Sequence, residues 1–523
     1  MPAVESAELA YAAARDARDR VDVARAKGRV ALALTAELQA RIRDVATALG
    51  AVSDEDTEDD ARAVQVMRRW LCEETAAAGR PGDAAQAGDS AEQRSLCELA
   101  ALSKEILGDF TAAAASVTID GTSRTRLATL GMLAEEPGPT RRRQMFLALE
   151  PTWRSMAGDG SHVAPYPKLV RLSAASWARG HSPADANAAA LGLDPGSIEP
   201  MLVQILEAWG DANAGRPRVE PWDWWYLHGA ADRAVHAAVP VGRLQELASA
   251  YCAALGADPR ALCVSFDIAA RPGRPDIPLA FTTFGGRPGA PHGPGIGPAS
   301  RPWVFATYTR GGLGELTELI HETGHAIHIA GISTRPAFAD WPDSDALTEA
   351  LAELVALDTA EPGWQLHWLG HSVPEALSLR CRYADVMLDV CWALFEIRMH
   401  ARPELSPDVL WSELTSRYLA IEPHPDLPWW ALRGQLVDLP GYMVNYALAA
   451  VLAADLRAAI RAQRGDWVRG DAGWYAWACA HIYRYGLARR SGQVVRDVLG
   501  RPPAVAALLQ EIGRTRDASG NRH

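Results

Sequence analysis

The stretch LIHETGHAIHIA, residues 319–330, places three histidines and one glutamate in an otherwise apolar run. His321 and His325 are four residues apart, so on a helix both imidazoles project from one face and can bind one cation. Glu322 follows the first histidine and can reach a metal-bound water without being a ligand itself, as in the HExxH motif. The pattern therefore predicts a zinc site. The alternative is an amphipathic helix with a few hydrogen-bonded histidines.

A zinc site of this kind needs a third protein ligand and an open position for water. Glu349, 24 residues after His325, is the best candidate, because an antiparallel return of the next predicted helix can bring it opposite the first. Glu353 lies one turn further along the same face and is predicted to orient a ligand histidine from behind. The alternative for both glutamates is a solvated stripe. His328 is predicted to be a packed, hydrogen-bonded histidine and not a fourth ligand.

Helical segments must position these residues. Apolar residues recur at spacings of three and four in several Ala-rich segments, and strand-like alternation is rare, so the fold class is predicted to be mainly α. The helix that carries the HExxH motif should run from about Gly314 to Gly331. Just before it, WVFATYT (residues 303–309, including Tyr308) is the best strand candidate. The clearest other helical segments are residues 21–49, 244–255, 345–357 and 446–461.

One segment cannot be helical. Residues 271–302 contain 15 glycines or prolines among 32 positions, which predicts a long irregular segment. Segments of this length in compact proteins are often lids or line a site. The alternative is a plain surface excursion.

Composition and charge exclude several classes of function. The chain has 523 residues, 48% of them hydrophobic, and a formal charge of −12, which argues against nonspecific nucleic-acid binding. Residues 443–460 are apolar but contain Asn445, Asp455 and Arg457, so a buried helix is expected and no membrane span. The N-terminus has no signal-peptide pattern. Seven scattered cysteines without a CxxC are expected to be buried reduced thiols, so we expect a cytoplasmic protein.

Several of these stretches together resemble a known family. LTELIHETGHAIH (residues 316–328) resembles the active-site helix of the zinc metallopeptidases of the thimet oligopeptidase and oligoendopeptidase F family, which are HExxH gluzincins. TEALAEL (residues 348–354) resembles the segment that supplies their third ligand. The other stretches that resemble this family are PWDWWYL (residues 221–227), PGYMVNYALAAVLAADL (residues 440–456) and LGRPPAVAALLQEIGR (residues 499–514).

The resemblance implies a two-lobed, mainly α metallopeptidase fold with a deep central channel and a small β element beside the active-site helix. It divides the chain into an N-terminal helical region, residues 1–220, and a catalytic region, residues 221–523, that includes the Gly/Pro-rich segment. It also implies one Zn²⁺ per chain, and it assigns the ligands to His321, His325 and Glu349.

The resemblance also places two tyrosines near the metal. Tyr442 and Tyr446 are four residues apart and share one helix face. Their alternative role is core packing, but the resemblance favours a hydroxyl that points at the substrate carbonyl. One position departs from the family pattern, because Gln435 stands where a histidine is expected, five residues after Trp430. Glutamine can donate a hydrogen bond but cannot become a cation, so support of the oxyanion should be weaker or arranged differently.

The leading hypothesis is a zinc-dependent metallohydrolase that cleaves peptide bonds in short oligopeptides, with Glu322 activating the zinc-bound water. The strand at residues 303–309 is expected to pair with the substrate backbone. A second hypothesis keeps the metal chemistry but recruits it to a specialised small amide, ester or biosynthetic intermediate. A third is a metal-bearing scaffold that binds peptides without cleaving them, which an intact Glu322 disfavours.

Overall fold

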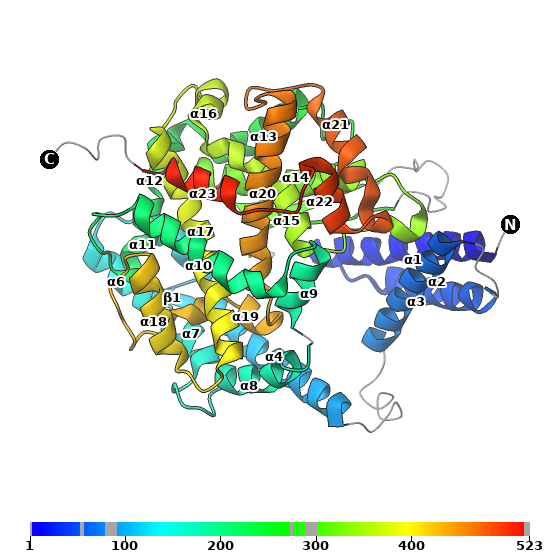
Figure 1. Ribbon diagram of the computed structural model, residues 1–523, viewed down its shortest axis with the longest axis horizontal. Helices are drawn as coiled ribbons and strands as arrows, with labels where there is room; N and C mark the ends of the chain where they lie inside the picture. Colours follow the sequence, from blue (N-terminus) through cyan, green and yellow to red (C-terminus); the bar gives the residue numbers. More distant parts are fainter. Residues whose placement is uncertain are drawn as a thin grey trace.

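The computed structural model describes residues 3–52, 57–78, 91–180, 182–271, 276–277, 279–287 and 301–516. Helices dominate it, which confirms the prediction of a mainly α fold class (Figure 1). The helices before the predicted HExxH helix are α1 (Ala3–Ala26), α2 (Leu32–Gly50), α3 (Glu58–Ala78), α4 (Ala91–Ala114), α5 (Arg126–Glu135), α6 (Pro139–Leu147), α7 (Glu150–Ala157), α8 (Pro165–Trp177), α9 (Pro183–Ala190), α10 (Ile198–Ala212), α11 (Trp224–His228), α12 (Ala230–Val235) and α13 (Leu244–Ala254).

The HExxH helix and those after it form the centre of the molecule. They are α14 (Gly312–Gly331), α15 (Asp345–Ala356), α16 (Pro362–Leu369), α17 (Glu375–Ala401), α18 (Pro407–Tyr418), α19 (Gln435–Asp438), α20 (Met443–Arg464), α21 (Trp474–His481), α22 (Ser491–Leu499) and α23 (Ala506–Gly513). Helix α20 passes through the middle of the fold beside α15 and α17 (Figure 1). The helical segments predicted at residues 244–255, 345–357 and 446–461 correspond to α13, α15 and α20.

The predicted helix at residues 21–49 is wrong as one element. Helix α1 ends at Ala26 and α2 begins at Leu32, and the two pack against each other as a hairpin. Gly28 lies in the turn at φ +66°, a conformation that a glycine adopts without steric cost. The helical periodicity of the sequence continues through this turn. Gly28 is therefore the local signal of the break between the two helices.

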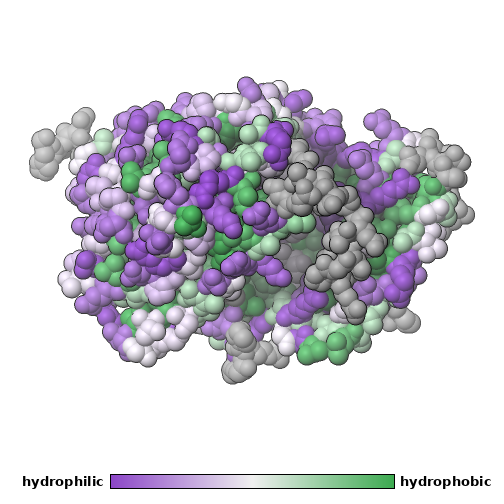
Figure 2. All heavy atoms as spheres, turned by 90° about the horizontal axis from the view of Figure 1, so that it is seen from below, coloured by the Kyte–Doolittle hydropathy of each residue, from purple (hydrophilic) through white to green (hydrophobic). Residues whose placement is uncertain are grey.

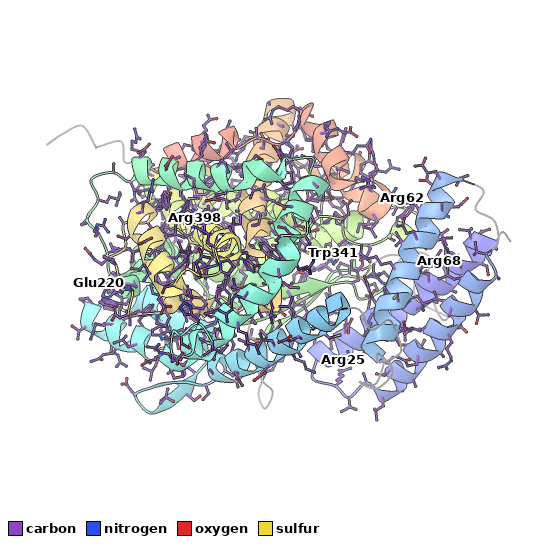
Figure 3. The ribbon with its side chains drawn as sticks, turned by 60° about the horizontal axis from the view of Figure 1, so that its bottom comes forward. Arg25, Arg62, Arg68, Glu220, Trp341 and Arg398 are labelled. Atoms are coloured by element: carbon purple, nitrogen blue, oxygen red, sulfur yellow. The ribbon has the colours of Figure 1, made fainter. Side chains whose placement is uncertain are left out.

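The N-terminal helices α1, α2 and α3 have a small hydrophobic core of their own, which they share with the 3₁₀ turn Pro336–Phe338. Buried ion pairs attach this unit to the rest of the chain, where Arg287 Nε lies 2.7 Å from Asp19 and Arg335 Nε lies 2.8 Å from Glu8. Trp341 follows this turn and lies where the N-terminal helices meet the main body (Figure 3). Figure 2 shows the molecule hollowed on the face between these two parts.

The large hydrophobic core takes side chains from Ile106 to Ile512 and so draws on both sides of residue 220. Trp153, for example, belongs to the same buried cluster as Trp429. The division of the chain at residue 220 stays a prediction, since a shared core does not tell where a functional region begins.

A three-stranded sheet, in the order β3-β5-β4, lies beside α14. Its strands are β3 (Ser265–Ala269), β4 (Phe281–Thr283) and β5 (Trp303–Tyr308), and a separate hairpin holds β1 (Val117–Ile119) and β2 (Thr122–Arg124). Strand β5 is the predicted strand, and the small β element beside the active-site helix is confirmed. It pairs parallel with β3 and antiparallel with β4, where Phe281 is opposite Phe305.

Strand β4 corrects one prediction. Residues 271–302 were expected to be irregular, but Phe281–Thr283 is a strand inside this segment. Pairing with β5 provides the backbone hydrogen bonds that the local composition does not suggest. Residues 272–275, 278 and 288–300 of the same segment lie outside the described residues.

All seven cysteines are free thiols. The expectation that they are buried is wrong for three of them. Two of these are on the peripheral helices α3 and α4, and the third is in the turn before β3, where nothing packs over the sulfur. Cys252, Cys381 and Cys391 are buried, Cys479 is intermediate, and Cys72, Cys97 and Cys263 are exposed.

Within the described residues, one helix, Met443–Arg464, is long and apolar enough to cross a membrane by length and composition. Its most apolar window is 78% buried inside the protein. Such burial is what a central core helix shows, so this helix by itself is weak evidence of a membrane span.

Helices α14 and α15 come closest at Gly324, in the middle of the HExxH motif. A Cβ atom at this position would lie 2.9 Å from both the Cα and the carbonyl oxygen of Ala352. These are backbone atoms, so no side-chain rotation can relieve the contact, and a larger residue would push the two helices apart.

We therefore expect Gly324→Ala to lower the free energy of unfolding by about 1–3 kcal/mol, although alanine is the better helix former. Gly210→Ala in α10 is the matched control, because nothing lies within 4 Å of a Cβ there. That control should gain up to about 1 kcal/mol. Thermal and denaturant unfolding measure both. Equal effects of the two substitutions would show that the close approach at Gly324 does not limit stability.

Candidate metal centre

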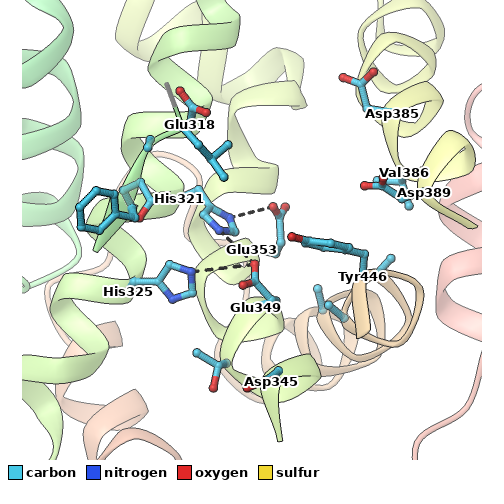
Figure 4. Close-up of a pocket in the computed structure, with 18 of the residues that line it drawn as sticks. Glu318, His321, His325, Asp345, Glu349, Glu353, Asp385, Val386, Asp389 and Tyr446 are labelled. Carbon is cyan, nitrogen blue, oxygen red and sulfur yellow. Dashed lines mark hydrogen bonds and ion pairs between the residues drawn. The ribbon is translucent and has the colours of Figure 1, made fainter. Parts of the chain in front are cut away.

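Helix α14 carries His321 and His325 on one face, and α15 presents Glu349 to them from the opposite side (Figure 4). The Glu349 Oε2 atom lies 3.4 Å from His321 Nε2 and 4.0 Å from His325 Nε2. One ligand atom from each of the three residues lies within 4.8 Å of the others. Three nitrogen and oxygen donors thus converge on one point.

This geometry fits a tetrahedral zinc ion. Ligand atoms at about 2.0–2.1 Å from zinc lie about 3.4 Å from one another. The distance from His321 to Glu349 matches this value, and that from His325 requires only a small adjustment of side-chain torsions. Two histidines and one glutamate are also a known donor set for catalytic zinc, which leaves one position open.

A second observation points to a cation at this place. His321 Nδ1 lies 2.9 Å from Glu353 Oε1, and a carboxylate only accepts, so Nδ1 donates. The Nε2 lone pair of a neutral His321 then faces the carboxylate of Glu349, also an acceptor. Two acceptors at this distance repel each other unless a proton or a metal ion lies between them. The site is therefore built for a positive charge.

The neighbouring carboxylates also favour a positive charge at His321. Burial alone would lower the pKa of His321, but hydrogen bonds to Glu349 and Glu353 outweigh burial and hold this pKa well above its ordinary value. Burial lowers the pKa of His325 to about 4, with the neighbouring His321 acting in the same direction. His325 thus stays neutral, which is the form that binds a metal.

Glu353 links the site to α17. Besides His321, it contacts the Arg382 guanidinium on that helix. Burial would raise the pKa of Glu353, but the interactions with Arg382 and His321 together outweigh burial and hold this pKa well below its ordinary value. Glu353 is therefore an ionised carboxylate that accepts from His321 on one side and from Arg382 on the other, and this contact orients the His321 ring.

Glu322 follows His321 on α14 and is buried in the wall of the same cavity. Thr282 Oγ1 of β4 lies 2.7 Å from its Oε2 atom and 2.8 Å from its carbonyl oxygen. Burial raises the pKa of Glu322 to about 7, against the lowering effects of His321 and of the hydrogen bond from Thr282. A carboxyl with a pKa near neutrality can accept and release a proton, which is the requirement for a general base.

The metal centre opens into a cavity of about 510 Å³. Tyr442 and Tyr446 line it from the N-terminal end of α20, their ring centroids 5.4 Å apart. In Figure 4 the Tyr446 ring points from α20 toward Glu349 and Glu353. Gln435 lines the same cavity. The structure thus brings these three residues together with the two histidines, Glu322, Glu349 and Glu353.

Two predicted site residues lie apart from this group. His328 is buried and packs against Trp341 and Tyr483, with ring centroids 5.6 and 5.0 Å away. Its packing is as predicted, and its Nδ1 has no hydrogen-bond partner within the described residues. Tyr308 is buried in β5 and is absent from the cavity lining.

Strand β5 cannot pair with a substrate backbone, so that expectation is wrong. It is the middle strand, and β3 and β4 occupy its two edges. Strand β4 is the edge strand on this side, and Leu279, Phe281 and Thr282, in and next to it, line the cavity. A substrate strand would therefore have to add to β4.

Sequence reasoning missed four residues that line this cavity. Thr282 lies in a segment expected to be irregular. Arg382 and Arg433 are far from the motif along the chain, and Trp341 follows a loop. Arg433 Nη2 lies 2.8 Å from Asp389 of α17, and its guanidinium carbon lies 5.0 Å from the Tyr446 ring centroid. No local pattern marks any of the four, because each reaches the site only through tertiary packing.

No protein-family model matches the sequence, and no curated protein matches it. Solved structures do match the fold. The M32 carboxypeptidase from Deinococcus radiodurans R1 is similar with a TM-score of 0.62 and 15% identity, covering 98% of each chain. A putative oligoendopeptidase F gives 0.60 and 17%, covering 97% of this chain and 95% of that one. PZ peptidase A, solved with an inhibitor, gives 0.58 and 16%, covering 92% of each.

The chain therefore has the fold of helical metallopeptidases over nearly its whole length. Carboxypeptidases and oligoendopeptidase F-like peptidases match about equally well, so the fold alone does not separate the two activities.

We expect the purified protein to bind about one zinc ion per chain, and His321→Ala together with His325→Ala to abolish this binding, since three donors are the minimum for a site of this type. Elemental analysis after dialysis measures the content. His400→Ala is a control, because this buried histidine contacts Ser173 far from the centre. Stoichiometric zinc in the double variant would refute the site.

The two glutamates of α15 should differ in their effect on the metal. Glu349→Gln should weaken zinc binding far more than Glu353→Gln, for which a loss of about 10–100-fold is expected from an outer contact. Competition with a chromogenic chelator measures both affinities. The reverse ranking would place the third ligand one turn further along α15.

Proposed function

We propose that the protein is a zinc-dependent metallopeptidase that cleaves peptide bonds in short oligopeptides. The observation that carries this proposal is the convergence of His321, His325 and Glu349 in a cavity whose wall holds Glu322, a buried carboxyl with a pKa near 7. A metal-binding scaffold needs the three donors only. A base beside them is what hydrolysis requires.

His321, His325 and Glu349 would hold the zinc ion, which when bound supplies Lewis-acid activation of the carbonyl and of water. Glu322 takes a proton from the attacking water and returns it to the leaving amine. The hydrogen bond from Thr282 orients this carboxyl, and the raised pKa suits both directions of transfer.

Tyr446 is the best donor to the developing oxyanion. Burial raises its pKa to about 12, against the lowering effect of Arg433, so the hydroxyl keeps its proton at neutral pH. Its ring points toward the metal centre from α20 (Figure 4). Tyr442 is a second candidate, because it lines the same cavity and its pKa is also raised by burial.

The substrate backbone would add to the free edge of β4, whose neighbours Leu279 and Phe281 expose apolar surface at the cavity. Such pairing fixes the register of a peptide without reading its sequence. A cavity of about 510 Å³ accepts a few residues in extended form and excludes folded proteins.

We favour internal cleavage over removal of a C-terminal residue. A second cavity of about 370 Å³ lies against His321, Glu353 and Arg382, which also line the first cavity. A peptide could then extend on both sides of the scissile bond. Peptides blocked by N-acetyl and C-terminal amide groups test this preference, because a carboxypeptidase cannot start on an amidated end.

A specialised substrate is the second candidate, and Gln435 is the observation that favours it. Gln435 lines the cavity next to Tyr446, and its hydrogen bond with the tyrosine acts to lower the pKa of that hydroxyl. A neutral amide at this position suits recognition of a particular polar group better than general support of an oxyanion.

The experiment that tests the proposal measures hydrolysis of quenched peptides of graded length by the zinc-loaded protein. Glu322→Gln should keep its zinc and lose activity by at least about 10²-fold, because Glu322 is the carboxyl that the HExxH motif places beside the first histidine, within reach of a metal-bound water. Glu413→Gln is the control, because this glutamate is exposed on α18 and does not line the cavity. Full activity of Glu322→Gln would refute its role as base, and inactivity of the loaded wild type on every peptide would refute the function.

The tyrosine and glutamine positions form a further prediction. Tyr446→Phe should lower kcat by about 10²–10³-fold with little change in KM, because the hydroxyl acts mainly in the transition state. Gln435→His should raise turnover of generic short peptides in an ordinary oligopeptidase and reduce the native reaction in a specialised enzyme. Unchanged rates in both variants would show that neither side chain reaches the reacting carbonyl.

A further inference from the structure

Glu396 of α17 is a buried carboxyl that the proposed chemistry does not use. Its side chain is 0% exposed, and within the described residues no arginine, lysine or histidine forms an ion pair with it. Its partners are two backbone amides of the segment that leads into α20. Gly441 N donates to Oε1 at 2.7 Å, and Met443 N donates to Oε2 at 3.2 Å.

This arrangement is costly. Burial raises the pKa of Glu396 to about 8, although the two amide hydrogen bonds lower it. Burying a carboxyl without a cation destabilises a fold, and apolar side chains of similar size avoid that loss. A carboxyl, however, offers a separate oxygen to each of the two amides, whereas a side-chain amide has one oxygen and an NH₂ group that only donates.

The two amides enclose Tyr442. Gly441 precedes it, Met443 follows it and begins α20, and Tyr446 lies in the first turn of that helix. Gly441 has φ +94°, and a Cβ there would lie 2.9 Å from Pro183 and 3.1 Å from Trp177, so the segment is also packed from outside. The segment is thus held both by the carboxyl of Glu396 and by these packing contacts.

The body of α20 is secured by other interactions. Asp455 contacts Arg501 and accepts from Ala504 N at 2.9 Å, and Arg457 Nη2 lies 2.5 Å from Asp358. These contacts lie two turns or more beyond Tyr446. The second half of α20 is therefore secured by ion pairs, and the bonds from Glu396 act on its first residues, where the tyrosines are.

We infer that Glu396 is a positioning residue that fixes Tyr442 and Tyr446 in the cavity by holding the backbone amides of Gly441 and Met443. The inference rests on the proposed function only for its kinetic consequence. The alternative is a carboxyl that merely stabilises the fold.

The test compares the zinc-loaded wild type with Glu396→Gln, which keeps the size of the side chain but offers one acceptor oxygen. Amide hydrogen exchange at residues 439–446 should accelerate by about 10-fold or more, since the segment loses an amide partner. The kcat for a quenched peptide should fall by about 10-fold or more with little change in KM and full zinc content, because misplacement of a catalytic group affects turnover.

A double-mutant cycle separates positioning from general stability. In the Tyr446→Phe background, Glu396→Gln should reduce kcat by less than about 2-fold, because the hydroxyl that it positions is already absent. Asp455→Asn is the control, a buried carboxylate on α20 itself. It should lower the melting temperature while leaving kcat and the exchange of residues 439–446 within about 2-fold of the wild type.

Unchanged exchange in Glu396→Gln would overturn the inference, and so would an equal loss of kcat with and without the Tyr446 hydroxyl. A loaded wild type that hydrolyses no peptide would refute the proposed function instead. The exchange rates would then decide alone whether Glu396 holds this segment.

Discussion

Helices α14 and α15 touch at Gly324 and Ala352, and the candidate site depends on this contact. With no side chain at position 324, the backbones approach closely enough for Glu349 of one helix to face His321 and His325 of the other. Wider separation would leave two imidazoles on one helix and a carboxylate out of reach. The glycine inside the HExxH motif is thus a geometric requirement of the third donor.

The charged residues around the three candidate donors differ in how their charges are balanced. Glu322, Glu349 and Glu353 bring three carboxyls to the wall of one cavity. Of these three, the one whose negative charge is paired with Arg382 is Glu353. The carboxylate of Glu349 faces the Nε2 atoms of His321 and His325. A divalent cation between these three groups would stabilise this arrangement. The low pKa of Glu353 and the raised pKa of Glu322 show how differently two carboxyls behave a few ångströms apart, one beside a guanidinium and the other buried beside a hydroxyl.

The remaining walls of the cavity come from three separate parts of the chain. Strand β4 brings Thr282 to Glu322, α17 brings Arg382 to Glu353, and the N-terminal end of α20 brings two tyrosines. Each of these parts is held by its own contacts: β4 by pairing with β5, α17 and α20 by the central core, and the start of α20 by Glu396. A site assembled in this way can change its substrate by changes in one wall while the donors stay in place, and Gln435 lies in such a wall.

The amino-acid sequence by itself determined the candidate donors, the candidate base and the helices that carry them. His321 and His325 are about one helical turn apart, so their common face follows from helix geometry alone, and Glu322 is next to the first of them. Glu349 and Glu353 are likewise one turn apart on the next predicted helix. It also determined the mainly helical class, because periodicity is a local property. Tertiary structure alone decided the rest. Strand β4 exists because β5 supplies its hydrogen bonds, and β5 is unavailable to a substrate because both its edges are paired. Arg382 pairs with Glu353, and Glu396 binds the start of α20, although the partners are far apart in the sequence. No local pattern predicts these contacts, because they result from the packing of α17 against neighbouring helices.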